Sequence, residues 1–559
     1  MELFNPVDYS KDWDGGCFVI GIDMGTTYSG VSYSFHKNGL PSDQIVPTTF
    51  RLWPGPASWD NKDIKIPSKI SYDANGSISW GLETEGKQRI ISWFKMLLVD
   101  DDDLRPEFQD SEYIQEAKFT MDALGKNPTQ VVADFLGKIF EYVVVYMGQE
   151  KGDDFVEKKP FHVIITVPAI WRGGPLQRMR EALKLSGILR SRRNQVPQTT
   201  YRFVTEPEAA ALATVPELNK WDTLLPGTSF VIADLGGGTA DCISYVVNST
   251  EPFELREIVE GDGALCGGVF LHQSFNMAMK KKALEQEGQN WDEFHQLEKE
   301  KIIGIWECFT RGTYKTELDG TLSIKLGSRI GSHQGPDVIF NFSRDEICSI
   351  FQVVMPTIEA LIERQVNAIK EKTLRFPKAI VLVGGLGQCS YIFEALKRRY
   401  YDKVPVIQEK GEKPRAAVSK GAVLCGTKGR VLIRSRIARY SYGYFLSKPF
   451  QEGIHNAEDR FHDTARNCDM ARGQMEWLVK RGDNIDTQAK KVRQYDLRFS
   501  HRARGVQTST EMIYESRSAQ PSDRKAELWV EDGFQMATQI TIRTPCPVEQ
   551  LPKVKEGGV

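Results

Sequence analysis

Paired cysteines, a large net charge and long apolar runs are all missing from this sequence. Its nine cysteines are scattered singly, without a Cys-x-x-Cys pair, which argues against a disulfide framework and favours reduced thiols. The cysteines and histidines show no spacing typical of a metal site. The formal net charge is only −2, so the composition gives no reason to expect nucleic acid or an anionic membrane as a partner.

No apolar run approaches the length needed to span a bilayer. The stretch Met1 to Ser10 lacks the basic and apolar regions of a signal peptide, so we expect a cytoplasmic protein. With 559 residues, the chain has room for about three or four domains. Its 41% apolar and 26% charged residues are typical of a soluble globular protein.

The most informative stretch runs from Phe230 to Val247. Val231–Ala233 predicts a buried strand that ends at Asp234, and Ile243–Val247 predicts a second strand. Between them lies a tight turn made of Gly236, Gly237, Gly238 and Thr239. A glycine backbone can approach an anion closely, and a neighbouring carboxylate suits a hydrated Mg²⁺ ion. The pattern therefore predicts a phosphate-binding hairpin.

A second copy of this pattern occurs near the N-terminus, at Phe18–Tyr33. An apolar strand ends at Asp23, a Gly/Thr turn follows, and a second strand ends in Val31-Ser32-Tyr33, where the later copy has Ile243-Ser244-Tyr245. An internal repeat on this scale predicts two related lobes, each with one phosphate loop.

Other segments are less specific when each is considered alone. Ile90–Leu98 is a mainly apolar segment that carries one lysine, Lys95, and a lone lysine in such a segment usually extends to solvent. Glu206 begins a predicted helix, and an acidic residue in the first turn can simply stabilise the helix through its macrodipole. Lys378–Gly387 is a third strand followed by a glycine turn, an arrangement that could hold the sugar and α-phosphate side of a nucleotide.

From about Gly429 the sequence predicts a β-rich module of ordinary domain size. Its short strand-like runs are separated by polar turns and comprise Tyr495–Phe499, Glu511–Tyr514, Glu527–Val530 and Ile540–Ile542.

Five segments together resemble the heat-shock protein 70 family, within the superfamily of actin, hexokinase and the heat-shock ATPases. They follow the family's order at comparable separations: Gly21–Tyr28, Ile165–Ala169, Thr205–Ala211, Ala233–Thr239 and Val383–Gly385. Within the family, the chain resembles the divergent branch typified by heat-shock protein 12A and its fungal relatives.

The resemblance implies an α/β fold with a two-lobed, actin-like ATPase, whose duplicated lobes are ribonuclease H-like, followed by a β-rich C-terminal domain. The expected parts are an N-terminal extension (1–15), lobe I (16–226), lobe II with a helix returning to lobe I (227–428), and the C-terminal domain (429–559).

The family's motifs also imply a site for ATP or ADP with Mg²⁺. Asp23 and Asp234 would hold the hydrated metal through water and orient the attacking water. Glu206 would join the water network of the metal, Lys95 would be the catalytic lysine, and Thr239 would also act at the reacting phosphate. The phosphates would lie between Gly25, Thr26, Thr27 and Tyr28 on one side and Gly236, Gly237, Gly238 and Thr239 on the other. The resemblance places the adenosine near Gly384, Gly385, Glu307 and Arg311.

The sequence departs from the family at the adenosine end of the site and at the interdomain linker. Thr310 and Tyr314 stand where the family usually has Lys and Ser, and Gln388-Cys389-Ser390 replaces Ser-Thr-Arg. Arg415 replaces an acidic residue, and the expected linker carries three arginines: Arg434, Arg436 and Arg439.

Three functions are therefore compatible with the sequence. The first is an ATP-binding, slowly hydrolysing chaperone whose partners are unfolded or client polypeptides and co-chaperones. The second is a nucleotide-dependent scaffold or sensor with vestigial hydrolysis, which the adenosine and linker departures favour. The third is a small-molecule kinase of the same superfamily, but the sequence shows no separate acidic base for a sugar pocket.

Overall fold

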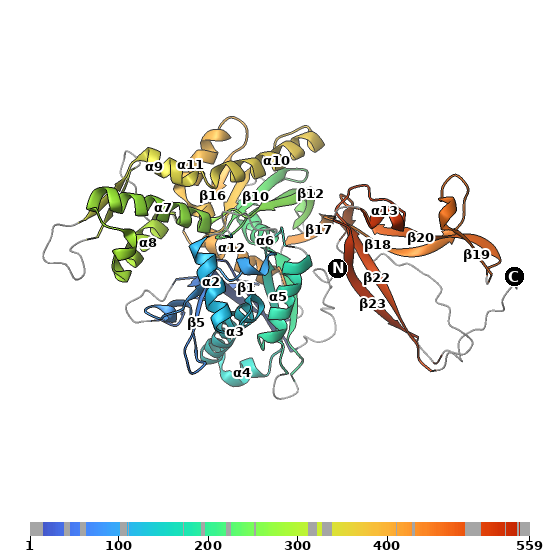
Figure 1. Cartoon of the computed structure of the whole chain (residues 1–559), viewed down its shortest axis with the longest axis horizontal. Helices are drawn as coiled ribbons and strands as arrows, with labels where there is room; N and C mark the ends of the chain where they lie inside the picture. The colour runs from blue at the N-terminus through green and yellow to red at the C-terminus, as the bar shows by residue number, and fades with distance from the viewer. Residues whose placement is uncertain are drawn as a thin grey trace. The chain divides into compact units, whose positions relative to one another are not determined.

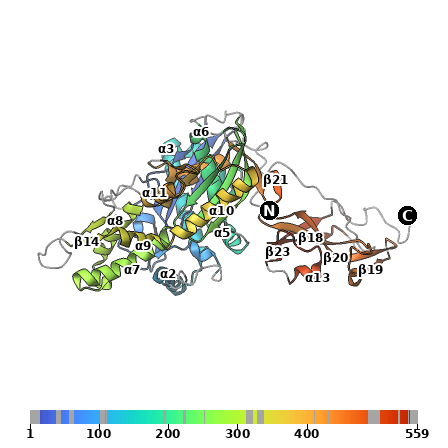
Figure 2. The ribbon, with the colours of Figure 1, turned by 90° about the horizontal axis from the view of Figure 1, so that it is seen from above.

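The computed structural model has a mixed α/β architecture (Figures 1 and 2). It describes residues 15–37, 45–55, 63–100, 109, 111–171, 173–191, 196–219, 225–250, 253–310, 321–326, 338–409, 411–427, 431–464, 466–486, 505–530, 533–544 and 547. The chain divides into two compact units, 1–432 and 433–559, and each is described by itself.

The first sheet of unit 1 has the strand order β3-β2-β1-β8-β9, with β4 paired to β2. Strands β1, β2 and β3 are antiparallel, whereas β8 and β9 run parallel to β1. Their bounds are β1 Cys17–Asp23, β2 Tyr28–His36, β3 Thr48–Thr49, β4 Ile66–Pro67, β8 Phe161–Val167 and β9 Thr200–Thr205. Every residue of β1 and β8 is buried, as expected for central strands without polar alternation.

Five strands of the second sheet repeat this topology in the order β12-β11-β10-β15-β16. Three antiparallel strands are again followed by two parallel ones. Their bounds are β10 Ser229–Leu235, β11 Ala240–Thr250, β12 Phe253–Ala264, β15 Ile380–Val383 and β16 Val406–Gln408. The two predicted hairpins are therefore β1–β2 and β10–β11, and they occupy equivalent positions in the two sheets.

Two helices pack against each other between these sheets. Helix α12 (Lys413–Cys425) contacts β1, β2 and β8, and α6 (Glu206–Asn219) contacts β10 and β11. Gly421 makes this close packing possible, because a Cβ atom there would lie 1.6 Å from the carbonyl oxygen of Ala209. Figure 1 shows both helices in the interior of unit 1. The N-terminus of α6 brings Glu206 into the space between the hairpins.

Other helices cover the outer faces. Helix α10 packs on β10, β11 and β12, and α3 packs against α5. The remaining helices of unit 1 have these bounds: α2 Glu112–Ala123, α3 Pro128–Lys151, α4 Asp153–Glu157, α5 Gly173–Leu185, α7 Gly268–Glu287, α8 Gln296–Thr310, α9 Arg344–Phe351, α10 Met355–Thr373 and α11 Ser390–Arg399. The short strands are β5 Lys69–Tyr72, β6 Ile78–Trp80, β7 Ile91–Ser92, β13 Leu322–Lys325 and β14 Ile339–Phe342. In the part of the chain that the structure describes, no helix combines the length and apolar character needed to cross a membrane.

Unit 2 contains a five-stranded antiparallel sheet in the order β19-β20-β18-β22-β23, and β17 pairs with β21. The bounds are β17 Val431–Ile437, β18 Ser441–Pro449, β19 Arg460–Asp463, β20 Cys468–Val479, β21 Asn484–Asp486, β22 Thr508–Ser516 and β23 Gln535–Arg543. The predicted strands Glu511–Tyr514 and Ile540–Ile542 lie within β22 and β23. The predicted strand Tyr495–Phe499 lies outside the described residues.

One strand prediction in unit 2 is wrong. The run Glu527–Val530 begins within a short helix, α13 (Lys525–Leu528). Leu528 is fully buried, whereas its neighbours Trp529 and Val530 are 55% and 85% exposed. Four residues are too few for periodicity to distinguish a one-sided helix from a strand.

Candidate functional site

The two hairpins each place a buried aspartate at the end of their first strand. Asp23 is the last residue of β1 and pairs with Gly30, while Asp234 near the end of β10 pairs with Asp241. Each carboxylate is about as buried as the surrounding core, with 4% exposure for both Asp23 and Asp234. The structural equivalence follows from the sequence repeat, because the same residue pattern forms the same hairpin.

In both hairpins, the carbonyl groups of the loop accept hydrogen bonds from a neighbouring segment. Ser68 donates from its N–H to the carbonyl of Thr27 (2.8 Å) and from its hydroxyl to the carbonyl of Gly25 (2.8 Å). In the other hairpin, the first residues of α7 donate to carbonyls: Gly268 N–H to Gly236 (3.2 Å) and Val269 N–H to Gly237 (2.8 Å). The loop carbonyls are thus engaged by neighbouring segments.

The N–H of Gly236 donates to the carbonyl of Thr239 (2.9 Å), whereas other loop N–H groups have no acceptor among the residues that the structure describes. This holds for five of them: Gly25, Thr26, Thr27, Gly237 and Gly238. Backbone N–H groups without an internal acceptor are suited to bind an anion such as a phosphate. The donor set therefore fits the predicted phosphate group.

The two loops also pack against each other. A Cβ atom on Gly237 would lie 2.4 Å from Oγ1 of Thr27, and one on Gly238 would lie 2.5 Å from Oγ1 of Thr26 and from Sδ of Met96. A side chain at either position would clash unless Thr26, Thr27 or Met96 moved away. The structure thus brings together the two sets of predicted phosphate-binding residues.

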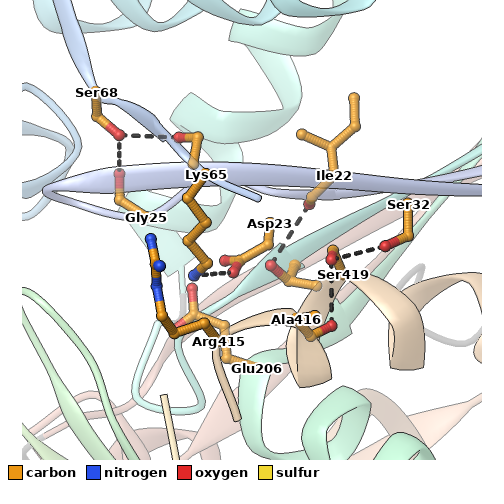
Figure 3. Close-up of polar contacts among 12 residues, drawn as sticks. Ile22, Asp23, Gly25, Ser32, Lys65, Ser68, Glu206, Arg415, Ala416 and Ser419 are labelled. Carbon is orange, nitrogen blue, oxygen red and sulfur yellow. Dashed lines mark hydrogen bonds and ion pairs between the residues drawn. The ribbon is translucent and has the colours of Figure 1, made fainter. Parts of the chain in front are cut away.

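Two lysines lie among the carboxylates of the site. Lys95 Nζ is 2.6 Å from Oε1 of Glu206. Lys65 Nζ is 2.7 Å from Oδ2 of Asp23, the ion pair drawn in Figure 3. The expectation that Lys95 considered alone would extend to solvent is wrong, since its side chain is 3% exposed and pairs with Glu206 from α6. Trp171 covers it, with Nζ 5.4 Å from the ring centroid.

Burial and mutual repulsion raise the pKa of several site carboxylates. The pKa of Asp234 lies well above its ordinary value, first because of burial and then because of Glu206, Asp241 and Asp23. Burial also raises the pKa of Glu206 and, with repulsion from Glu206, raises that of Asp241 to about 7. A bound cation would relieve this repulsion.

The arrangement fits a metal that retains its own waters. Among the described residues, no group of three or more His, Cys, Asp and Glu side chains is placed to ligate a metal directly. Mg²⁺ keeps several waters and needs few protein ligands, so Asp23 and Asp234 could hold it through water.

The predicted adenosine end is only partly described. Tyr28 donates from its hydroxyl to Oε2 of Glu307 on α8 (2.6 Å), which brings two predicted site residues from different elements into direct contact. Gly384 follows β15 and lies against Asp234, because a Cβ atom there would be 2.4 Å from Oδ1 of Asp234. An added Cβ on Gly385 would have no atom of the described residues within 4 Å. Arg311 and Tyr314 lie outside the described residues.

Sequence reasoning missed two charged residues of the site. Asp241 accepts from the N–H of Ala169 (3.0 Å) and from Thr239. It could have been found, because a hairpin that turns at three glycines places Asp241 opposite Asp234. Lys65 carried no such signal, since its position depends on the pairing of β4 with β2.

Arg415 is explained by a distant partner. It forms an ion pair with Asp63 at 2.9 Å, and Asp63 Oδ1 also accepts from the N–H of Lys65 (3.4 Å). The arginine thus links α12 to the segment that carries Lys65, which gives the departure from the family pattern a structural role.

Sequence comparisons find relatives among heat-shock proteins. The chain is 23% identical to heat shock 70 kDa protein 12A of mouse (Mus musculus), over 82% of this chain and 76% of that protein. The human (Homo sapiens) protein of the same name is also 23% identical, over 79% of this chain and 74% of the relative. The chain is related to the heat-shock protein 70 family. This confirms the resemblance inferred from the five motifs.

A second group of heat-shock protein 70 relatives matches a shorter region. A chaperone protein HscA homolog of Burkholderia multivorans is 24% identical over 70% of this chain and 55% of the relative. The chain thus spans about half the length of these bacterial proteins. Residues 436–527, within unit 2, match a family model described as "Domain of unknown function (DUF8568)".

Proposed function

We propose that this heat-shock protein 70 relative binds ATP with Mg²⁺ between its two hairpins and hydrolyses it slowly, as a chaperone-like protein. The observation that carries the proposal is the pair of equivalent hairpins, with a buried aspartate in each and mutually packed loops. Five N–H groups of these loops have no acceptor among the described residues. The common topology of the two sheets supports a two-lobed, actin-like ATPase, with 1–15, 16–226, 227–428 and 429–559 as its parts.

Each group of the site has a role in this proposal. The N–H groups of both loops hold the phosphates, and Tyr28 and Thr239 line the same space. Lys95, held by Glu206, neutralises negative charge near the reacting phosphate, and Asp23 and Asp234 hold the hydrated metal and orient the attacking water. Bound Mg²⁺ supplies charge neutralisation. Phosphoryl transfer needs mainly positioning and electrostatic stabilisation, so these groups are sufficient.

We extend the proposal to partners and location by family analogy. Relatives carry the names heat shock protein and chaperone protein, so unfolded or client polypeptides and co-chaperones are the proposed partners, in the cytoplasm. Unit 2 is the proposed polypeptide-binding module. Gly384, Gly385, Glu307 and Arg311 remain the proposed adenosine contacts.

The test is an assay of Mg-ATP binding and phosphate release on the purified full chain. Wild type should bind ATP and release phosphate, while Asp23→Ala, Lys95→Ala and Asp234→Asn should each reduce release. Wild-type release no higher than that of Asp234→Asn would reject the ATPase. Addition of an unfolded polypeptide should accelerate release if the protein is a chaperone.

A second candidate is a nucleotide-dependent scaffold or sensor. The observation that favours it is the changed segment after Gly385: Gln388 donates to the carbonyl of Gly411 (2.6 Å) and Cys389 is buried, so these side chains are engaged within the protein. ATP binding without phosphate release, and without a response to unfolded polypeptide, would favour this function.

A further inference from the structure

Lys65 is a charged residue of the site that the proposed function does not use. It precedes β4, which pairs with β2 through Tyr28 and Pro67 and through Ser29 and Ile66. Ser68 then fastens this segment to the loop, through its bonds to the carbonyls of Gly25 and Thr27. The backbone of Lys65 is therefore held beside the first phosphate loop.

Strand β2 leaves room for the Lys65 side chain at Gly30. Gly30 is the residue paired with Asp23, and a Cβ atom on Gly30 would lie 3.2 Å from Cγ and 3.5 Å from Cε of Lys65. Because Gly30 has no side chain, the stem of Lys65 crosses β2 at this point and its ammonium reaches Asp23 (Figure 3). The Lys65 side chain is only 11% exposed.

The ammonium also acts on carboxylates beyond Asp23. Lys65 partly offsets the upward pKa shifts of both Glu206 and Asp234, so it lies within the field of acids from both hairpins. Among the described residues, the site contains four buried acids, Asp23, Glu206, Asp234 and Asp241, and Lys65 and Lys95 form ion pairs of 2.7 and 2.6 Å with two of them. Lys95 pairs with Glu206, so in the part of the chain that the structure describes Lys65 is the lysine that pairs with Asp23.

We propose that Lys65 is a resident cation of the nucleotide site. It holds Asp23 when no metal is bound and contacts phosphate oxygens when a nucleotide enters, so binding depends less on Mg²⁺ than it would without this lysine. An ammonium has three N–H donors and can bond a carboxylate and a phosphate together. This inference rests on the proposed nucleotide binding.

The experiment measures the Kd of the full chain for a non-hydrolysable ATP analogue by isothermal titration calorimetry, in Mg²⁺ and in EDTA. Wild type should bind under both conditions. In Lys65→Met, the Kd in EDTA should increase about ten- to hundredfold, the effect of losing one charge-assisted hydrogen bond. The Kd in Mg²⁺ should increase less, because Mg²⁺ then neutralises the phosphates, so the ratio of the Kd in EDTA to the Kd in Mg²⁺ should increase. Lys65→Arg, which keeps the charge, should show a smaller increase.

Lys87→Met is the matched control, because Lys87 also pairs with an aspartate, Asp73 at 3.2 Å, but at an exposed position. Its ratio should equal that of wild type. If Lys65→Met does not fold, Lys65→Gln replaces it, since an amide can still donate to Asp23.

If the ratio of the Kd in EDTA to the Kd in Mg²⁺ in Lys65→Met stays within about twofold of wild type, the inference is wrong and Lys65 only forms a structural ion pair. Wild-type binding that disappears in EDTA would also overturn the inference, while leaving the proposed function intact. No binding by wild type in either condition would overturn both.

Discussion

Gly384 offers the sharpest test of how the site is built. Its φ of 84° lies in the left-handed region, and an added Cβ would lie 2.4 Å from Oδ1 of Asp234 and 2.5 Å from the carbonyl oxygen of Leu235. Gly384→Ala should therefore destabilise the protein through backbone strain of about 1–2 kcal/mol and overpacking of about 1–3 kcal/mol. The expected loss in the free energy of unfolding is about 2–5 kcal/mol.

The adjacent Gly385 is the matched control. Its φ of −65° is helical, and no atom of the described residues lies within 4 Å of an added Cβ. Gly385→Ala should be neutral or stabilise by about 0.4–1 kcal/mol, because alanine restricts the unfolded chain. Urea denaturation followed by tryptophan fluorescence measures both variants. Equal stability of the two variants would refute the close approach of Gly384 to Asp234.

Three further changes test other parts of unit 1. Lys95→Met leaves Glu206 buried without its partner and should lower the free energy of unfolding by about 3–5 kcal/mol. Adding Glu206→Gln should recover part of this loss. A double variant as unstable as the single one would contradict the ion pair. Tyr28→Phe removes the bond to Glu307 and should cost about 1.5–3 kcal/mol by urea denaturation, whereas an unchanged midpoint would mean that the bond contributes nothing. His162 is fully buried, and burial lowers its pKa from 6.5 to about 4. The unfolded chain therefore takes up the proton first, so the stability that wild type has above pH 6.5 should fall by up to about 3 kcal/mol as the pH drops to 4. The free energy of unfolding of His162→Gln, measured by urea denaturation, should change less with pH than that of wild type. Equal pH dependence in the two proteins would argue against a neutral buried histidine.

The sequence alone was sufficient to predict the two hairpins and their aspartates. Apolar strands, glycine turns and terminal carboxylates are local patterns, and their repetition along the chain predicts two equivalent elements. The heat-shock protein 70 relationship followed from the order of five such patterns and is confirmed by the relatives. Local pattern was insufficient at Glu527–Val530, where four residues could not distinguish helix from strand.

Only the tertiary structure could decide which charges meet. Lys95 considered alone was expected to reach solvent, but α6 brings Glu206 to it and Trp171 covers it. Lys65 reaches Asp23 because β4 pairs with β2 and Gly30 leaves room for its stem. Ion pairs between residues far apart in sequence depend on strand register and helix packing. These are set by the whole core, and the residues beside each charge do not reveal them.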